Sequence, residues 1–140
     1  MTRILSIDYG KKRIGLAITD ERRIMALPLE TISTGKSHQE SVKNLAKATS
    51  QYSILEIVLG LPLLPNGQES PMSVEVRAFA KTLEAQTKWP VEFFDERFTS
   101  IRAHQELASF SRKKRTPKLD ETSALILLQD YLEKKRLETS

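Results

Sequence analysis

The chain contains no cysteine among its 140 residues. Neither a disulfide framework nor a thiolate metal site can therefore exist, and nothing calls for an oxidising compartment. Long hydrophobic runs are also missing, because no stretch approaches the roughly 20 consecutive apolar residues that a membrane-spanning helix needs. The amino-terminal residues lack the apolar core and the cleavage site of a signal peptide. We therefore expect a cytoplasmic protein without a membrane span.

The rest of the composition is that of a globular protein. Hydrophobic residues make up 39% of the chain and charged residues 29%, which places it outside the disordered and membrane-spanning classes. A chain of this length can bury one sizeable core but is too short for two ordinary domains. We find no internal repeat, and we predict a single domain over residues 1–140.

Positive charge is concentrated in one part of the sequence. The formal net charge is +4. Five basic residues lie within seven consecutive positions: Arg112, Lys113, Lys114, Arg115 and Lys118. Without these five the net charge would be −1, so the basic character is local. Such a cluster indicates contact with a polyanion at one place, with a solvated loop as the alternative.

Apolar periodicity predicts an α/β fold. Five short apolar runs have the length and composition of strands: residues 3–9, 13–20, 24–33, 54–59 and 91–95. Turn signals join the first three into an antiparallel meander, and the last two are typical of buried parallel strands. Helical spacing follows the capping residues Ser37 and Ser70, and further helices are predicted at 100–110 and from Leu119. Gly60 is expected to begin a loop, because two prolines and an Asn-Gly pair follow it.

These elements predict a mixed five-stranded sheet, a three-stranded antiparallel meander plus two parallel strands, with helices on both faces. Sites in such sheets lie beyond the carboxyl ends of the strands. Three carboxylates fall at such places: Asp8 ends the first strand, Glu96 follows the fifth, and Asp120 begins the last helix. Converging carboxylates can hold paired Mg²⁺ for phosphodiester hydrolysis. Asp95 competes with Glu96 for this role, and Asp120 could instead cap its helix.

Other residues near these acids could contact a phosphate. Gly10 permits a tight turn and lets a phosphate approach the backbone. Arg97 could either neutralise a carboxylate or bind phosphate through two parallel hydrogen bonds. Thr99 is expected to cap the following helix, where hydroxyl and amide groups also suit a phosphate. His38 is expected to be a surface residue without a catalytic role.

Four blocks of sequence, in order, resemble a known family. They are Ile7-Asp8-Tyr9-Gly10 with Lys12-Arg13-Ile14-Gly15-Leu16-Ala17, Gly60-Leu61-Pro62 with Asn66-Gly67, Asp95-Glu96-Arg97 with Thr99, and Asp120 ahead of Ser123-Ala124. With these blocks the chain resembles the YqgF family of the RNase H-like superfamily, described as Holliday junction resolvases and pre-16S rRNA nucleases. The resemblance implies an RNase H-like fold. It also implies that Asp8, Glu96 and Asp120 form a catalytic triad that binds Mg²⁺ or Mn²⁺, with Lys12 and Arg13 beside it.

We therefore expect a metal-dependent endonuclease that cuts structured nucleic acid, with the 5′ end of the 16S rRNA precursor as first candidate. The basic residues of 112–118 would bind the backbone, a pre-ribosomal particle is a possible partner, and the protein would act as a monomer or homodimer. One alternative is a Holliday junction resolvase in DNA recombination and repair. Another is a non-catalytic assembly factor that binds pre-rRNA through Lys11, Lys12, Arg13 and the basic segment. A phosphotransfer ATPase is disfavoured, because related folds close two such domains over the nucleotide.

Overall fold

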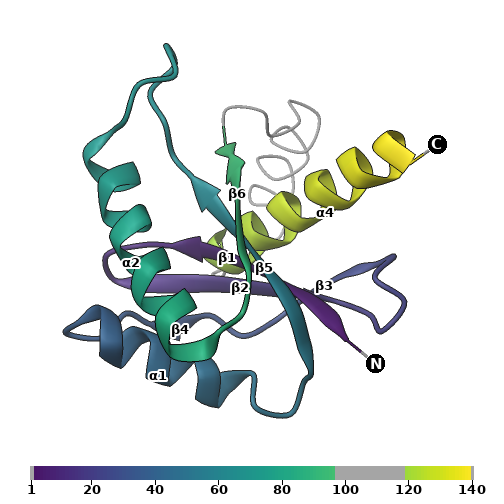
Figure 1. The fold of residues 1–140 in the computed structure, drawn as a ribbon, viewed down its shortest axis with the longest axis horizontal. Helices are drawn as coiled ribbons and strands as arrows, with labels where there is room; N and C mark the ends of the chain where they lie inside the picture. The colour runs from purple at the N-terminus through teal and green to yellow at the C-terminus, as the bar shows by residue number, and fades with distance from the viewer. Residues whose placement is uncertain (1, 97–118, 140) are drawn as a thin grey trace.

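A six-stranded sheet forms the centre of the computed structural model (Figure 1). The structure describes residues 2–96 and 119–139, and it describes the side chains of the last helix over 123–138. The strands are β1 (Arg3–Tyr9), β2 (Arg13–Thr19), β3 (Ala26–Pro28), β4 (Ile32–Ser33), β5 (Ile54–Leu61) and β6 (Val91–Asp95). The helices of the described part are α1 (His38–Ala48), α2 (Pro71–Thr87) and α4 (Leu119–Thr139). The predicted helix at 100–110 and the basic segment 112–118 lie outside the described residues.

The order of the sheet is β3-β2-β1-β5-β6, and β4 also pairs with β2. β1 is antiparallel to β2 and parallel to β5, and β6 continues the parallel half. The predicted mixed sheet is therefore confirmed. Its third strand is broken into β3 and β4, because the register against β2 shifts by one residue between them: Ala17 pairs with Pro28, but Ile14 pairs with Ile32.

The prediction that Gly60 begins a loop is wrong. Gly60 pairs with Phe94 and Leu61 pairs with Asp95 across the parallel ladder from β5 to β6. The strand therefore continues two residues beyond the predicted end at Leu59. Pairing with the neighbouring strand outweighs the local loop signal of the prolines that follow.

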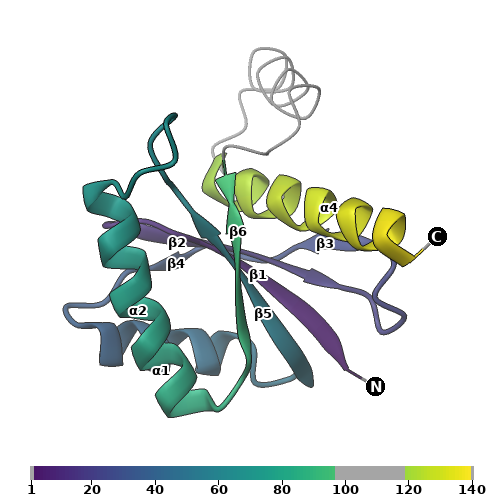
Figure 2. The same ribbon diagram turned by 45° about the horizontal axis from the view of Figure 1, so that its top comes forward.

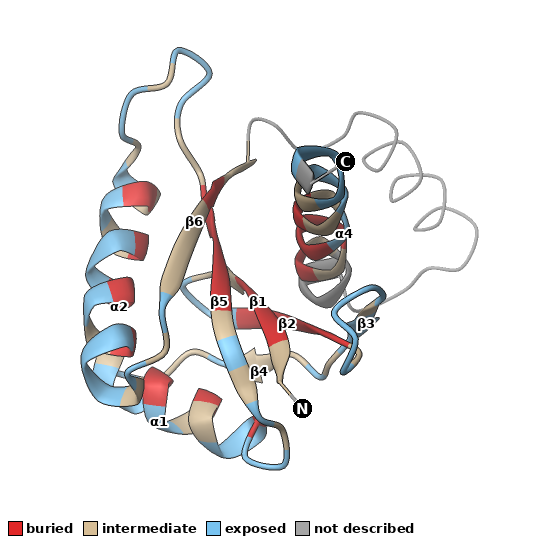
Figure 3. Cartoon of the chain, turned by 45° about the vertical axis from the view of Figure 1, so that its right-hand side comes forward, coloured by how far each residue is buried: buried red, intermediate tan, exposed pale blue. Residues whose placement is uncertain are grey.

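Helices lie on both sides of the sheet (Figure 2), and a hydrophobic core fills the space on each side. Figure 3 marks the buried residues in red. One core joins the sheet to α1 and α2, and it includes Leu5, Ile7 and Phe79. The other joins the sheet to α4, and it includes Val58 and Tyr131. Helices thus cover both faces, as predicted. No helix in the described ranges has the length and apolar character that crossing a membrane requires.

The predicted capping residues begin both helices of the first layer. The Ser37 side chain accepts a hydrogen bond from the backbone N–H of Glu40 at the start of α1. Ser70 does the same for Ser73 at the start of α2, whose first residue is Pro71. Each cap satisfies a backbone donor that the helix itself leaves without a partner.

Tyr131 ties α4 to the two parallel strands beneath it. Its side chain is fully buried, and its hydroxyl lies 3.3 Å from Oε1 of Glu56 and 3.2 Å from Oε1 of Glu92. Lys135 Nζ lies 3.8 Å from Oε1 of Glu92. Burial, and then the charges of the two glutamates, raise the pKa of Tyr131 above its usual value.

Tyr131→Phe is expected to reduce the loss of stability at high pH. Because the folded protein holds the Tyr131 proton more tightly than the unfolded chain does, this group stabilises the fold below about pH 10 and less so as pH rises further. The free energy of unfolding in urea, measured at about pH 9 and about pH 11, should therefore fall less in the variant than in wild type. Equal falls in both proteins would contradict this role of Tyr131.

Candidate active site

Asp8 lies near the end of β1, on the face of the sheet that α4 covers. Alternate residues of β1 show this orientation: Ile4 packs in the core beneath α4, and Ser6 Oγ donates a hydrogen bond of 3.0 Å to the carbonyl oxygen of Ala124. Asp8 is the next residue on that side of the strand. Its side chain is half-buried. The carboxylate therefore lies at the carboxyl edge of the sheet, within reach of solvent.

Glycine occupies the position beside Asp8 on both neighbouring strands. Asp8 pairs with Gly15 of β2. Ile7 of β1 pairs with Leu59 of β5. Gly60, the next residue of β5, therefore lies beside Asp8, the next residue of β1. Neither neighbouring strand therefore places a side chain next to the Asp8 carboxylate. Glycine on both sides lets another group approach the Asp8 carboxylate closely.

Glu96 lies directly over Gly60. A Cβ atom at Gly60 would collide with Oε1 of Glu96 and would stand 3.2 Å from its carboxyl carbon. Val58, two residues before Gly60 on the same side of β5, packs in the core beneath α4. The Glu96 carboxylate thus lies over β5 on the same face as Asp8. Since adjacent strands are about 4.8 Å apart, it is about one strand spacing from β1.

Gly60 is the residue of this site that the sequence prediction missed. Its absent side chain is what allows the Glu96 carboxylate to reach across β5 toward Asp8. A signal was available, because a glycine at the end of an apolar strand pattern often marks a close approach by another group. We call Asp8 and Glu96, which Gly60 separates, the carboxylate pair.

Asp120 belongs to the first turn of α4, but its side chain lies outside the described part of the structure. Ala124, one helical turn later, is joined to Ser6 of β1 by the hydrogen bond described above. Ser6 is two residues before Asp8 on the same side of its strand. The backbone at the start of α4 therefore lies over the face that carries Asp8. Among residues with described side chains, no group of three or more acidic or histidine residues is arranged to hold a metal ion.

Gly10 closes the turn between β1 and β2. A Cβ atom there would lie 2.6 Å from the carbonyl oxygen of Arg13, so a side chain would not fit. Thr34 braces the turn, donating from Oγ1 to the Gly10 carbonyl at 2.7 Å and from its backbone N–H to the Lys12 carbonyl at 3.0 Å. Lys12 and Arg13 are exposed. Gly10 thus has a clear structural role in the turn, and the turn presents two basic side chains at the same end of the sheet as Asp8.

His38 is less exposed than its polar neighbours predict, although it is not fully buried. Its side chain is only 24% exposed, and Nε2 lies 3.6 Å from Oε2 of Glu75. Its ring packs edge-on against the rings of Tyr9 and Phe79, with centroids 6.1 Å and 5.9 Å away. These partners belong to the core on the side of α1 and α2. His38 therefore lies on the opposite face of the sheet from the carboxylate pair.

The remaining predicted contacts lie in the part of the chain that the structure does not describe. They are Arg97, Thr99, Arg112, Lys113, Lys114 and Arg115. Their roles at the site stay predictions.

Comparison with known proteins shows end-to-end similarity. A sequence model of the family described as "RuvX: Holliday junction resolvase" matches residues 2–134. A Protochlamydia amoebophila protein named "Putative pre-16S rRNA nuclease" is 42% identical over 140 residues, which cover 94% of this chain and 93% of that protein. A Bacteroides fragilis protein of the same name is 39% identical over 142 residues, which cover 98% and 100%.

The fold also matches a solved structure. RuvC of Thermus thermophilus in complex with a Holliday junction substrate superposes with a TM-score of 0.63 and covers 97% of this chain and 96% of that one. Sequence identity is 11%. This match confirms the predicted RNase H-like fold, and a shared fold does not by itself specify a substrate.

Proposed function

The chain belongs to the RuvX family, and from that membership we propose that it is a metal-dependent nuclease that hydrolyses phosphodiester bonds in structured nucleic acid in the cytoplasm. The observation that carries the proposal is the carboxylate pair, Asp8 and Glu96, on one face at the carboxyl edge of the sheet. The names of the relatives make the 5′ end of the 16S rRNA precursor the first candidate substrate. A branched DNA junction is the second, from the description of the family.

The carboxylate pair fits a hard divalent cation. Carboxylate oxygens are the ligands that Mg²⁺ and Mn²⁺ prefer, and Asp120 would supply a third group. When bound, such a cation supplies Lewis-acid polarisation of the phosphate and lowers the pKa of water. Of the two neighbouring acids at the end of β6, we assign the ligand role to Glu96 rather than Asp95, because the Glu96 carboxylate lies over Gly60 on the face of Asp8.

The surrounding residues would bind and orient the substrate. Gly15 places no side chain beside Asp8, which lets the phosphodiester backbone approach from the side of β2. Lys12 and Arg13, exposed at the adjoining turn, would bind non-bridging phosphate oxygens. The predicted contacts beyond the described residues would extend this basic surface along the backbone: Arg97, Thr99, Arg112, Lys113, Lys114 and Arg115.

Removal of divalent cations is expected to stop cleavage. Wild-type protein is incubated with precursor 16S rRNA and, separately, with a four-way DNA junction, each with Mg²⁺, Mn²⁺ or a chelator. We expect cleavage of at least one substrate with either ion and none with the chelator. Equal cleavage in the chelator, or none under any condition, would overturn the proposal. Binding of the RNA without cleavage would instead support a non-catalytic role in assembly of the pre-ribosomal particle.

The same experiment bears on the oligomeric state. Symmetric cleavage of a four-way junction needs two sites related by a twofold axis, which a homodimer provides. Processing of one RNA strand needs a single site, which a monomer provides. The molecular mass in solution, with and without each substrate, distinguishes these two states.

A further inference from the structure

The loop that joins β5 to α2, residues 62–69, extends beyond the sheet. Figures 1 and 3 show it leaving the carboxyl end of β5 and projecting away from both helix layers. It begins two residues after Gly60, the residue that lies between Asp8 and Glu96. The projecting loop is therefore anchored at the edge of the sheet that carries the carboxylate pair.

The tip of this loop is an ordered turn. The backbone N–H of Gly67 donates to the Leu64 carbonyl at 2.8 Å, and the backbone N–H of Leu64 donates to the Gln68 carbonyl at 2.9 Å. Asn66 Oδ1 accepts a further hydrogen bond of 3.0 Å from the backbone N–H of Gln68. Gly67 has a φ of 89°, a conformation that favours glycine. The turn thus holds one conformation through its own hydrogen bonds.

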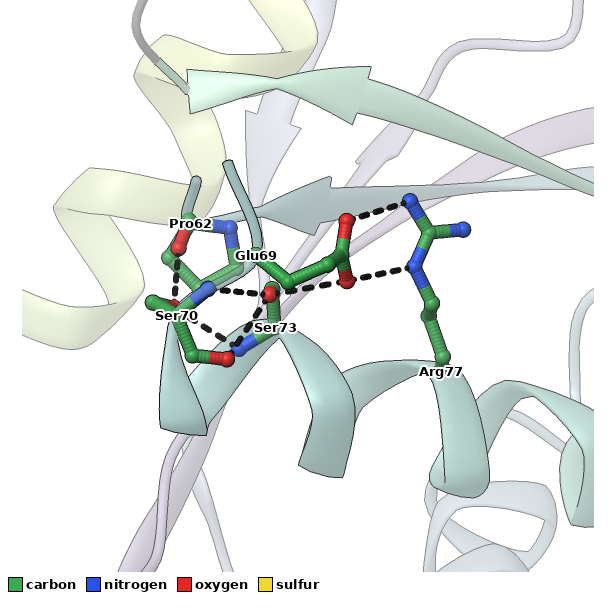
Figure 4. Close-up of polar contacts among 5 residues, drawn as sticks. All are labelled: Pro62, Glu69, Ser70, Ser73 and Arg77. Atoms are coloured by element: carbon green, nitrogen blue, oxygen red, sulfur yellow. Dashed lines mark hydrogen bonds and ion pairs between the residues drawn. The ribbon is translucent and has the colours of Figure 1, made fainter. Parts of the chain in front are cut away.

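The base of the loop is joined to the start of α2 (Figure 4). The hydroxyl of Ser70 donates to the carbonyl of Pro62, the first residue of the loop. The same hydroxyl accepts from the backbone N–H of Ser73, whose own side chain accepts from the backbone N–H of Ser70. One capping residue therefore ties the beginning of the loop to the beginning of the helix.

An ion pair holds the other side of the base (Figure 4). The Glu69 carboxylate accepts hydrogen bonds of 2.8 Å from Nε and 3.0 Å from Nη2 of Arg77. These hydrogen bonds lower the pKa of the Glu69 carboxyl. The guanidinium carbon of Arg77 also lies 5.2 Å from the centroid of the Phe93 ring, so the ion pair rests against β6. Paired side chains of this geometry restrict the orientation of the loop relative to the sheet.

The loop tip is uncharged and partly apolar. Residues 60–68 carry no charged side chain, although 29% of the chain is charged. Leu64 is 39% exposed, and Pro65 is exposed beside it. Such a tip has no charge with which to attract phosphates. Nucleic acids present apolar base faces where helical stacking is interrupted, and leucine and proline are among the side chains that pack there.

We propose that Leu64 and Pro65 pack against a base face exposed at an interruption of helical stacking, and that the loop thereby sets where the carboxylate pair cuts. This inference rests on the proposed nuclease function and specifies the substrate: a helix with an end, bulge or junction near the cut. Leu64 is four residues after Gly60, a span of up to about 13 Å. At about 3.4 Å per stacked nucleotide, the cut should fall within about four nucleotides of the interruption.

Two matched variants test the contact at the tip. Leu64→Ala shortens the side chain at the tip, whereas Leu55→Ala makes the same change at the opposite end of β5, at a leucine that is 44% exposed. Binding is measured in chelator, with 2-aminopurine at the interruption of a helix and, for comparison, within an uninterrupted helix. We expect the wild type and Leu55→Ala to change the fluorescence only at the interruption. Leu64→Ala should bind the interrupted helix at least about five-fold more weakly, with little change for the uninterrupted one.

Arg77→Met tests whether the brace acts through the loop. It keeps most of the side-chain stem but removes the ion pair with Glu69. The double variant combines Arg77→Met with Leu64→Ala. If Arg77 acts only by positioning the loop, this double variant should prefer the interrupted helix over the uninterrupted one as much as Leu64→Ala alone does. Cut sites mapped with divalent cation should spread beyond about four nucleotides in Arg77→Met.

The outcomes separate this inference from the proposed function. Equal effects of Leu64→Ala and Leu55→Ala, or equal fluorescence changes on both helices, would overturn the inference even if the protein cleaves nucleic acid. A fluorescence change that depends on Leu64, in a protein that cleaves nothing, would support the base contact and overturn the nuclease.

Discussion

Asp8→Asn is expected to abolish cleavage of the nucleic acid while leaving the fold intact. Asparagine has nearly the same shape as aspartate, so the half-buried position between Gly15 and Gly60 accommodates it. It lacks the negative charge with which the Asp8 carboxylate would attract a divalent cation, so it is a much weaker ligand. Mutation of a residue that only supports a metal ligand already lowers metal affinity or activity by about 10- to 100-fold. We therefore expect the cleavage rate to fall by more than about 100-fold.

Thermal unfolding and a charge-matched variant serve as controls for Asp8→Asn. Removing one of several clustered carboxylates reduces their repulsion, so the metal-free variant should be at least as stable as wild type. Glu84→Gln removes an exposed carboxylate from α2, on the other side of the sheet, and should leave cleavage unchanged. A folded Asp8→Asn protein that cleaves at the wild-type rate would show that Asp8 has no part in catalysis.

Gly60→Ala is the second change with a large expected effect. Its Cβ atom would collide with Oε1 of Glu96 and must displace that carboxylate. Because Oε1 is the far end of a flexible side chain, the carboxylate can move aside at small cost, and we expect the free energy of unfolding to fall by no more than about 1 kcal/mol. Displacement of Glu96 separates the carboxylate pair, so cleavage should fall as well. Urea unfolding and initial cleavage rates measure the two effects.

A double-variant cycle shows whether the effect of Gly60→Ala passes through Glu96. Glu96→Ala removes the carboxylate that the new methyl group meets. In that background Gly60→Ala should cost less stability than it does in wild type, by about 0.5 kcal/mol or more. An equal cost in both backgrounds would mean that Gly60→Ala disturbs β5 itself and not its contact with Glu96.

Much of the sheet could be predicted because the strands are short and bounded by strong turn signals. The β1–β2 turn at Gly10 and the caps at Ser37 and Ser70 are local features, and the structure shows each of them. Asp8 could be located at a strand end for the same reason. The break between β3 and β4 could not be predicted, because it comes from a shift of register against β2 and the apolar run continues past it.

The features that were missed depend on contacts between distant segments. Gly60 continues β5 only because β6, some thirty residues later, pairs with it. His38 follows a helix cap, and its polar neighbours predict exposure. Its burial comes from Tyr9 and Phe79, which belong to β1 and α2. Local sequence cannot reveal such contacts, and the reach of Glu96 over Gly60 is another of them.

The most direct test is to locate a bound cation. Crystals of wild-type protein and of Asp8→Asn, each grown with Mn²⁺, are compared by anomalous scattering from the metal. We predict an Mn²⁺ ion between the carboxylates of Asp8 and Glu96 in the wild type and a weakened or absent ion in the variant. A wild-type crystal with no Mn²⁺ at these two carboxylates, or an ion whose occupancy does not depend on Asp8, would contradict their joint role in metal binding.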